Sequence, residues 1–271
     1  MDINEIKTRA EEEYLRWVEN VKPNQEYYRQ LQQLRDNPDE CLDSFYTELT
    51  FGTSGLRGIL GPGTNRINGF VIRRTTQGLA NYLNDYYENP SVIIGYDSRE
   101  NSDYYARETA SVLNGNGIKT YLFDRIAPVS VLSYGITRLK CSMGVMITAS
   151  HNPKIYNGYK VYNRDGYQIV GDEPHKILEE IQKVDFFSGI KYDRNNIEKV
   201  PEDVPRDFVD IVSGVSTNLT KSKLNELKTV YTPLNGAGCE FVKKGFAAIG
   251  YENYKDRKST RLNSSHALAS R

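Results

Sequence analysis

An apolar run ends in a polar loop at residues 144–153, which read Gly-Val-Met-Ile-Thr-Ala-Ser-His-Asn-Pro. The apolar part, 144–148, predicts a buried strand, and Pro153 ends regular strand pairing. Ser150 therefore follows the carboxyl end of a strand, where α/β sheets carry their ligand sites. From the residues alone, Ser150 is either a nucleophile or phosphate carrier, or part of a turn held by local side-chain hydrogen bonds. For an isolated Ser-His-Asn-Pro tetrapeptide, the turn is the simpler interpretation.

Segments of helical and strand character alternate on both sides of this run. The predicted strands cover residues 92–96, 119–123 and 143–148. The predicted helices of the same region cover residues 68–84, 102–114, 129–139 and 172–184. This alternation suits βαβ units, so we expect an α/β fold with a mixed, mostly parallel sheet covered by helices.

The chain is expected to divide where its composition changes. Residues 1–48 predict a helical extension with helices at about 2–20, 24–36 and 39–47, and residues 49–204 form the main domain with Ser150. After a polar, proline-containing stretch, residues 205–255 begin a second, incomplete α/β unit, with a helix from 208 and a strand from 229. Residues 256–271 are interpreted as a non-native tail and left out of the fold prediction.

The bulk composition excludes several classes of protein. Lys plus Arg and Asp plus Glu both number 35, so the net charge is zero, which argues against a general nucleic-acid binder. No apolar run approaches the ~18–20 residues of a membrane span, and the polar start of the chain does not resemble a signal peptide. Three widely separated cysteines suggest reduced thiols in a cytoplasmic protein.

Acidic residues are missing from two long stretches of this neutral chain. None occurs between Glu48 and Asp85 or between Asp124 and Asp165, although both stretches contain arginines. This bias indicates a positive field focused on a small anion. Chance clustering around buried strands is the alternative.

Three common nucleotide or nucleophile motifs are not matched. The loop around Ser150 lacks the Gly-x-Ser-x-Gly pattern of an α/β-hydrolase elbow. The turn at 61–63 lacks the third glycine of a dinucleotide loop, and no Gly-Lys-[Ser/Thr] P-loop occurs. Hydrolase, NAD-dependent and ATP-dependent functions are therefore disfavoured.

Several ordered motifs resemble those of one enzyme family, the α-D-phosphohexomutases. Residues 148–162, Thr-Ala-Ser-His-Asn-Pro-Lys-Ile-Tyr-Asn-Gly-Tyr-Lys-Val-Tyr, resemble its active-serine signature, and 51–58, Phe-Gly-Thr-Ser-Gly-Leu-Arg-Gly, its first active-site loop. Further matches are Gly-Thr-Asn-Arg at 63–66, Thr-Gln-Gly-Leu-Ala at 76–80, Tyr-Asp-Ser-Arg at 96–99, and Val-Tyr-Thr-Pro-Leu-Asn-Gly-Ala-Gly at 230–238. The resemblance covers about residues 10–255 and favours the phosphoglucomutase/phosphopentomutase branch, with a domain I fold of the phosphoglucomutase type.

The resemblance implies a phosphoserine mechanism centred on Ser150. The serine would phosphorylate a sugar monophosphate, and the bisphosphate intermediate would return its other phosphate, interconverting sugar 1- and 6-phosphates or pentose 1- and 5-phosphates. Phosphoryl transfer depends on positioning and on charge stabilisation by Mg²⁺ and cations. Arg57 and Lys160 are the matched cations, with Lys160 also a candidate general acid/base. His151 would bind sugar or phosphate oxygens, and Asn152 would shape the loop beside the substrate.

Other arginines and aspartates have less definite roles. Arg66 and Arg99 are compatible both with a site role and with fixing the fold through ion pairs. The family's aspartate-rich Mg²⁺ loop is not found in the sequence, and Asp203, Asp207 and Asp210 have the wrong spacing to replace it. Ser150, through its phosphate, would then be the chain's one Mg²⁺ contact.

The expected function follows with one alternative. The chain is interpreted as an inactive N-terminal fragment of a cytoplasmic phosphoglucomutase-type enzyme that acts on sugar phosphates, is activated by a sugar bisphosphate, and has no nucleic-acid or membrane partner. The alternative is a non-catalytic module that binds phospho-sugars or partner proteins without turnover.

Overall fold

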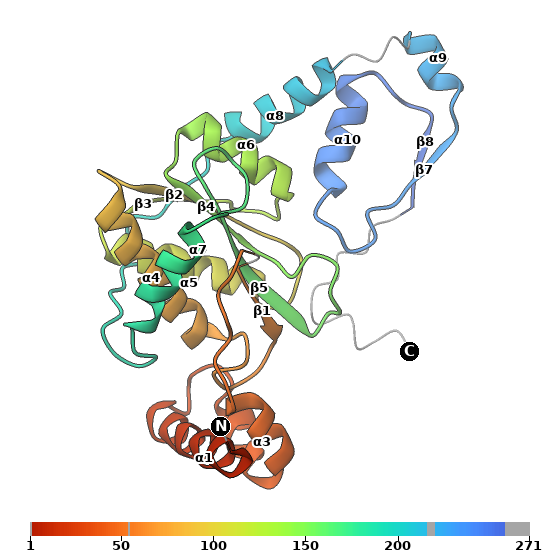
Figure 1. The fold of residues 1–271 in the computed structure, drawn as a ribbon. Helices are drawn as coiled ribbons and strands as arrows, with labels where there is room; N and C mark the ends of the chain where they lie inside the picture. Colours follow the sequence, from red (N-terminus) through yellow and green to blue (C-terminus); the bar gives the residue numbers. More distant parts are fainter. Residues whose placement is uncertain (1, 54, 216–219, 258–271) are drawn as a thin grey trace.

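The computed structural model describes residues 2–53, 55–215 and 220–257. Its main sheet has six strands in the order β1-β5-β4-β2-β3-β6 (Figure 1). The strands are β1 Leu56–Ile59, β2 Ser91–Tyr96, β3 Lys119–Leu122, β4 Met143–Ile147, β5 Tyr156–Tyr162 and β6 Glu198–Lys199. β2 is parallel to β3 and β4, and β3 is parallel to β6, whereas β5 is antiparallel to β4 and β1. The predicted mixed, mostly parallel α/β sheet is therefore confirmed.

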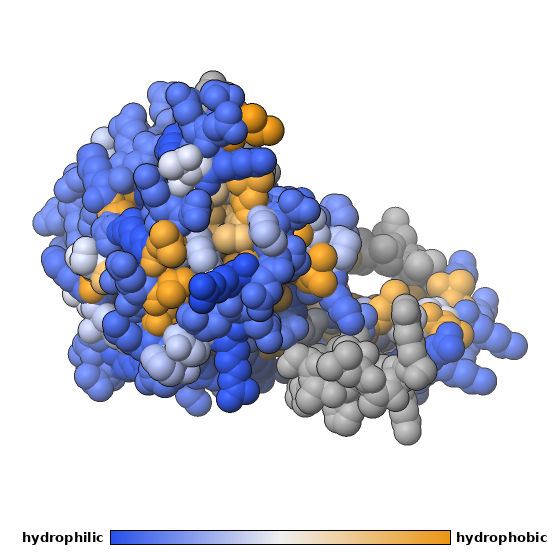
Figure 2. All heavy atoms as spheres, turned by 90° about the horizontal axis from the view of Figure 1, so that it is seen from below, coloured by the Kyte–Doolittle hydropathy of each residue, from blue (hydrophilic) through white to orange (hydrophobic). Residues whose placement is uncertain are grey.

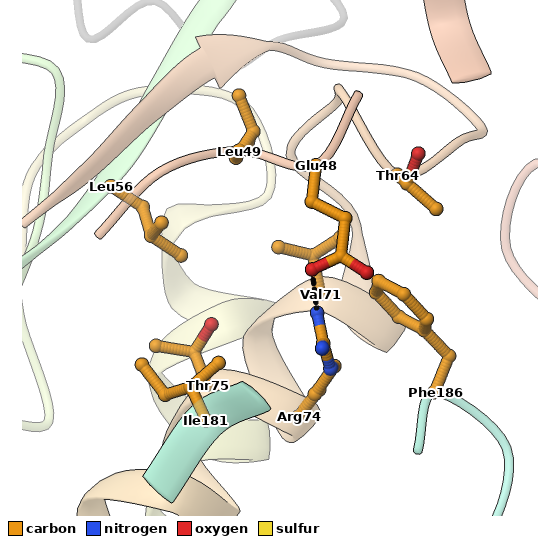
Figure 3. A pocket seen from close by; sticks show the side chains of 9 residues that line it. All are labelled: Glu48, Leu49, Leu56, Thr64, Val71, Arg74, Thr75, Ile181 and Phe186. Atoms are coloured by element: carbon orange, nitrogen blue, oxygen red, sulfur yellow. Dashed lines mark hydrogen bonds and ion pairs between the residues drawn. The ribbon is translucent and has the colours of Figure 1, made fainter. Parts of the chain in front are cut away.

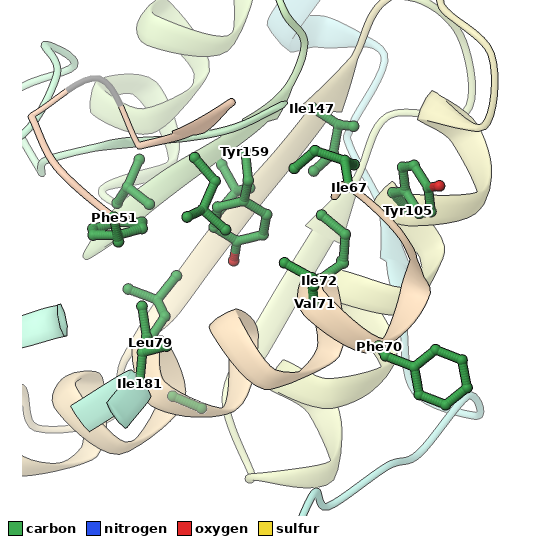
Figure 4. Close-up of a cluster of buried hydrophobic side chains, with 14 of the residues drawn as sticks. Phe51, Ile67, Phe70, Val71, Ile72, Leu79, Tyr105, Ile147, Tyr159 and Ile181 are labelled. Atoms are coloured by element: carbon green, nitrogen blue, oxygen red, sulfur yellow. The ribbon is translucent and has the colours of Figure 1, made fainter. Parts of the chain in front are cut away.

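The central strands are apolar because helices cover both faces of the sheet. The helices are α4 Gly69–Tyr86, α5 Ser102–Gly115, α6 Val129–Leu139, α7 Glu173–Gln182 and α8 Asp203–Gly214. Ile94 of β2 packs into the cluster formed with α4, α5 and α7, whereas its neighbour Ile93 packs into the cluster formed with α6 and α8. Figure 4 shows the first cluster, with Tyr159 of β5 and Ile147 of β4 directed toward α4.

The N-terminal extension packs on the main domain through an aromatic cluster. It consists of α1 Ile3–Asn20, α2 Tyr28–Gln33, the 3-10 helix η1 Leu34–Asp36 and α3 Pro38–Phe45. Trp17, which is 1% exposed, contacts the rings of Phe45 in the extension and of Phe70, Phe186 and Phe187 in the main domain. The extension is therefore part of the folded unit rather than a separate appendage.

The helix predicted at 24–36 is wrong in its first turn. Glu26 accepts hydrogen bonds from the backbone N–H of Gly69 and from the hydroxyl of Tyr105, and Tyr27 adopts a left-handed conformation with φ +60°. These contacts with the main domain hold residues 26 and 27 outside the helix, so α2 begins only at Tyr28.

The second unit is larger than the sequence predicted. It contains α9 Lys221–Glu226, β7 Thr229–Tyr231, α10 Cys239–Ala248 and β8 Tyr254–Asp256, with β7 and β8 parallel. The prediction of one strand and one helix there was wrong, because it missed α9, α10 and β8. Of these, α9 and β8 are too short to show a clear hydrophobic pattern. α8 begins at Asp203 rather than 208, since Pro205 is tolerated in a first helical turn. Residues 258–271, most of the predicted tail, lie outside the described part.

The face shown in Figure 2 is mostly hydrophilic, with apolar side chains scattered over it. Within the described residues, no helix combines the length and hydropathy needed to cross a bilayer.

A close backbone contact at the start of β1 gives a test of the sheet arrangement. Gly55 has φ +72°, and a Cβ there would lie 1.9 Å from the carbonyl oxygen of Tyr159. Gly117 has a similar φ of +76° but open space around its Cα. We expect Gly117→Ala to lower the free energy of unfolding by about 1 kcal/mol through backbone strain. Gly55→Ala should cost about 1–3 kcal/mol more because β1 and β5 must separate.

Urea denaturation followed by circular dichroism measures both variants against the parent chain. Equal losses in the two variants would contradict the close approach of Gly55 to β5.

Candidate active site

Ser150 lies immediately beyond the carboxyl end of β4, with its side chain exposed to solvent. Its backbone is left-handed, with φ +57°, a conformation that costs a non-glycine residue roughly 1–3 kcal/mol and clusters at functional sites. Its N–H donates to the Thr148 hydroxyl at 2.9 Å. The serine is thus presented at the sheet edge in a strained, internally bonded turn.

One arginine from the neighbouring strand holds this turn through its main chain. Arg99 follows β2, and its Nη2 donates to the carbonyl oxygens of Ser150 at 2.8 Å and Asn152 at 2.6 Å. Its Nη1 donates to those of Pro153 at 3.0 Å and Tyr156 at 2.9 Å. Arg99 also forms an ion pair with Asp97, so it fixes the fold around the loop; the alternative, a role in the site, stays a prediction.

The Asp97 carboxylate connects the loop after β2 with the end of β4. Its Oδ2 accepts from the Thr148 hydroxyl at 2.6 Å, and its Oδ1 accepts from the Ser102 hydroxyl at 2.8 Å and from the Arg99 N–H at 3.0 Å. Arg99 Nε lies 3.4 Å from Oδ2. Both oxygens of Asp97 are therefore engaged within the protein.

Arg57 reaches the serine loop from β1. The register pairs Arg57 with Gly158 of β5, and the exposed guanidinium donates from Nη1 to Asn152 Oδ1 at 3.0 Å. A Cβ at Gly158 would lie 2.6 Å from the Leu56 carbonyl oxygen and 2.7 Å from that of Thr148. Glycine at 158 therefore lets β1 and the end of β4 approach β5 closely enough for the contact.

Lys160 lies on β5 opposite Met146 of β4 and is partly buried. Burial lowers the pKa of its ammonium group, and the positive charge of Arg57 lowers it further, while the Asp97 carboxylate opposes both effects. Lys160 is thus electrostatically coupled to the groups that surround the serine loop. A lowered pKa is what a lysine acting as a proton carrier requires.

His151 is the remaining predicted site residue. Its side chain is exposed, and its Nδ1 lies 3.4 Å from Ser150 Oγ. The structure therefore brings Ser150, His151, Asn152 and Arg57 together by direct contact. Lys160 is linked to them through its electrostatic interaction with Arg57. No role was predicted for Asp97 or Thr148, although Asp97 belongs to the Tyr-Asp-Ser-Arg motif at 96–99.

The other charged candidates lie elsewhere. Arg66 donates to Asp43 and serves to fix the fold, and Arg138 of α6 pairs with Asp203 and Asp207 of α8. Over the described ranges, no group of three or more His, Cys, Asp or Glu side chains is placed to hold a metal ion.

The pocket drawn in Figure 3 is not at the serine loop. It lies between the start of β1, α4 and the end of α7, and is lined mostly by apolar side chains. The ion pair between Arg74 and Glu48, at 2.7 Å, spans it. It is best explained as a packing crevice of the core.

A family model agrees with the main domain. The model described as "Phosphoglucomutase/phosphomannomutase, alpha/beta/alpha domain I" matches residues 48–188. This range includes all the site residues described above.

Curated relatives extend the similarity beyond that domain. The chain is 39% identical over 212 residues to a phosphoglucomutase of Staphylococcus haemolyticus, covering 77% of the chain and 39% of the relative. It is 32% identical over 245 residues to a phosphoglucomutase of Staphylococcus aureus strain USA300, covering 88% of the chain and 43% of the relative. The chain thus spans about two fifths of the length of these relatives.

Solved structures share the fold. A putative phosphomannomutase from Thermus thermophilus superimposes with a TM-score of 0.67 at 23% identity, over 81% of this chain and 48% of that one. A phosphoglucomutase/phosphomannomutase family protein from Burkholderia thailandensis gives 0.62 at 19% identity, over 79% and 45%.

The electrostatic coupling at Lys160 gives a pH-dependent prediction. Arg57→Gln removes a positive neighbour that disfavours the ammonium form, so the pKa of Lys160 should rise toward its ordinary value. NMR titration of ¹³C-methylated lysines measures the change, with Lys160→Arg assigning the resonance. Arg138→Gln, on the surface of α6, is the matched control and should leave the Lys160 titration in place. A Lys160 pKa that is unchanged or lower in Arg57→Gln would contradict the coupling.

Proposed function

The chain belongs to the phosphoglucomutase/phosphomannomutase family, and from this membership we propose that it carries the phosphoserine of a sugar-phosphate mutase. The observation that supports this proposal most strongly is the position of Ser150. Its hydroxyl is exposed at the carboxyl end of a parallel strand, in a loop fixed through its main chain, beside the cations Arg57 and Lys160.

The proposed reaction is a transfer of one phosphoryl group in each direction. With Ser150 phosphorylated, the free hydroxyl oxygen of a sugar monophosphate attacks phosphorus, and the bond from phosphorus to Ser150 Oγ breaks. The sugar hydroxyl loses its proton and Ser150 Oγ gains one, giving a sugar bisphosphate and free serine. After the bisphosphate reorients, the same steps in reverse return its other phosphoryl group to Ser150.

Four side chains at the site have proposed roles in these steps. Arg57 stabilises negative charge on the transferring group, because phosphoryl transfer depends on positioning and charge. Lys160 accepts or returns the sugar proton, since its lowered pKa makes the neutral amine more accessible. His151 donates to a sugar or phosphate oxygen, while Asn152 positions Arg57 and borders the substrate.

The substrate class follows from the named relatives. Those proteins are called phosphoglucomutases, so we propose glucose 1-phosphate and glucose 6-phosphate first, with pentose 1- and 5-phosphates as the further candidates. A sugar bisphosphate would load Ser150. Mg²⁺ would offset the charge of the phosphoserine, with most of its ligands supplied from outside the described residues. We further propose a cytoplasmic location. The predicted divisions of the chain at 48, 204 and 255 remain a proposal, with the last two moved to before Asp203 and after Asp256, because α8 and β8 would otherwise be cut.

The share of the relatives that the chain covers suggests what it can do alone. Because it spans 39–43% of those proteins, we propose that this chain holds the phosphoryl carrier without completing the catalytic cycle. The described residues contain no metal-binding group of three or more ligands, which favours the second candidate function, a module that binds phospho-sugars or partners without turnover.

Replacing the carrier tests the main proposal. In the protein encoded by the uninterrupted reading frame that contains this chain, Ser150→Ala should lower mutase kcat by at least about 10³-fold, because no covalent carrier remains. A coupled assay for glucose 6-phosphate measures turnover. Ser130→Ala, an exposed serine of α6, is the control and should retain activity. Parent-like turnover by Ser150→Ala would refute the assignment.

The isolated chain gives a separate prediction. Purified residues 1–271 should show no conversion of glucose 1-phosphate to glucose 6-phosphate in the same assay, with Mg²⁺ and bisphosphate present. Measurable turnover that disappears in Ser150→Ala would show that the chain is a complete enzyme.

A further inference from the structure

We infer that Arg99 is the positioning residue of the phosphoryl carrier: its guanidinium fixes the main chain of the loop from which Ser150 presents its hydroxyl. The functional part of this inference rests on the proposed role of Ser150. The structural part, that one side chain orders the serine loop, stands on the contacts alone.

The loop converges on Arg99 through its main chain. Four carbonyl oxygens, those of Ser150, Asn152, Pro153 and Tyr156, accept from the two terminal nitrogens of this one side chain at 2.6–3.0 Å. The Arg99 side chain is only 12% exposed, so water could replace few of these donors. Carbonyl oxygens that point at one spot repel each other unless a cation lies between them.

The terminal nitrogens of Arg99 donate only within the protein. A guanidinium has five N–H groups, and the four on Nη1 and Nη2 match the four carbonyl contacts. None of these four is left for a substrate phosphate, and Nε lies within ion-pair distance of Asp97 Oδ2, at 3.4 Å. Arg57 differs from Arg99 in this respect. Its guanidinium is exposed, and among the described residues it donates to one side chain, that of Asn152.

Both peptide groups of Ser150 are held as a result. Its N–H donates to the Thr148 hydroxyl, and its carbonyl accepts from Arg99. These two bonds maintain the left-handed φ of +57°, which would otherwise relax toward a more common conformation. Because the Cα–Cβ direction follows from the backbone, fixing φ and ψ at Ser150 fixes the position of Cβ and leaves Oγ only the staggered positions of χ1.

The Asp97 carboxylate in turn holds Arg99 in place. Asp97, two residues earlier, accepts from the Arg99 N–H and from the hydroxyls of Thr148 and Ser102. Ser102 in turn accepts from the side chain of Asn157 on β5. This network of hydrogen bonds therefore connects the ends of β2, β4 and β5. A lysine at position 99 has one compact ammonium group and cannot reproduce the planar set of donors of the arginine guanidinium.

Hydrogen exchange of the 271-residue chain, followed by mass spectrometry, tests the structural part. In Arg99→Lys and Arg99→Ala, amides of residues 150–156 should exchange at least about tenfold faster, while β2 and β4 keep their protection. Low, non-denaturing guanidinium should restore loop protection in Arg99→Ala. Arg107→Ala, an exposed arginine of α5, is the control and should resemble the parent chain.

If Arg99→Ala does not fold, Arg99→Lys decides the question. Parent-like loop exchange in Arg99→Lys would overturn the inference. Equal loss of protection throughout residues 49–204 would also overturn it, because Arg99 would then be a general stability residue.

A kinetic comparison in the protein from the uninterrupted reading frame tests the functional part. Arg99→Lys should lower kcat by up to about 10²-fold through misplacement of Ser150, with KM for glucose 1-phosphate little changed. A raised KM with unchanged kcat would instead indicate substrate contact and overturn the positioning role. If Ser150 proves not to be the carrier, the exchange result still holds, so the two failures are distinguishable.

Discussion

The arrangement of the site depends on the position of β4 between a parallel neighbour, β2, and an antiparallel one, β5. Parallel pairing brings the ends of β2 and β4 to the same edge, so the turn with Asp97 and Arg99 meets the loop with Ser150. Antiparallel pairing brings Lys160 back beside β4, and β1 then adds Arg57. Strand register therefore brings Arg57 to the serine loop and Lys160 beside β4, and a one-residue slip would turn both side chains to the other face.

The same turn also reaches the second unit. The Ser98 hydroxyl donates to the carbonyl oxygen of Asn235, while Arg125, beyond β3, pairs with Glu202 and with Glu240 of α10. Phe208 of α8 and Phe241 of α10 add an edge-to-face contact. Since Ser98 stands between Asp97 and Arg99, the turn that holds the serine loop is also one of the places where the main domain touches the second unit.

Much of the fold could be predicted from the sequence because its central strands are continuous apolar runs between well-marked helices. β1 and β5 were absent from the predicted elements, since Leu56–Ile59 is short and β5 interrupts its apolar residues with asparagine, glycine and lysine. The break before α2 depends on bonds from Glu26 to the distant Gly69 and Tyr105. Motifs located Ser150, Arg57 and Lys160, but the role of Arg99 depends on contacts to residues at least 51 positions away, which local patterns do not encode.

The central claim is that Ser150 accepts and returns a phosphoryl group. It is tested most directly by incubating the protein from the uninterrupted reading frame with glucose 1,6-bisphosphate carrying a ³²P label, and mapping the label by peptide sequencing. We expect label on Ser150 alone, and its loss to added glucose 1-phosphate. Label on another residue, or none on a correctly folded protein that interconverts the sugar phosphates, would contradict the account.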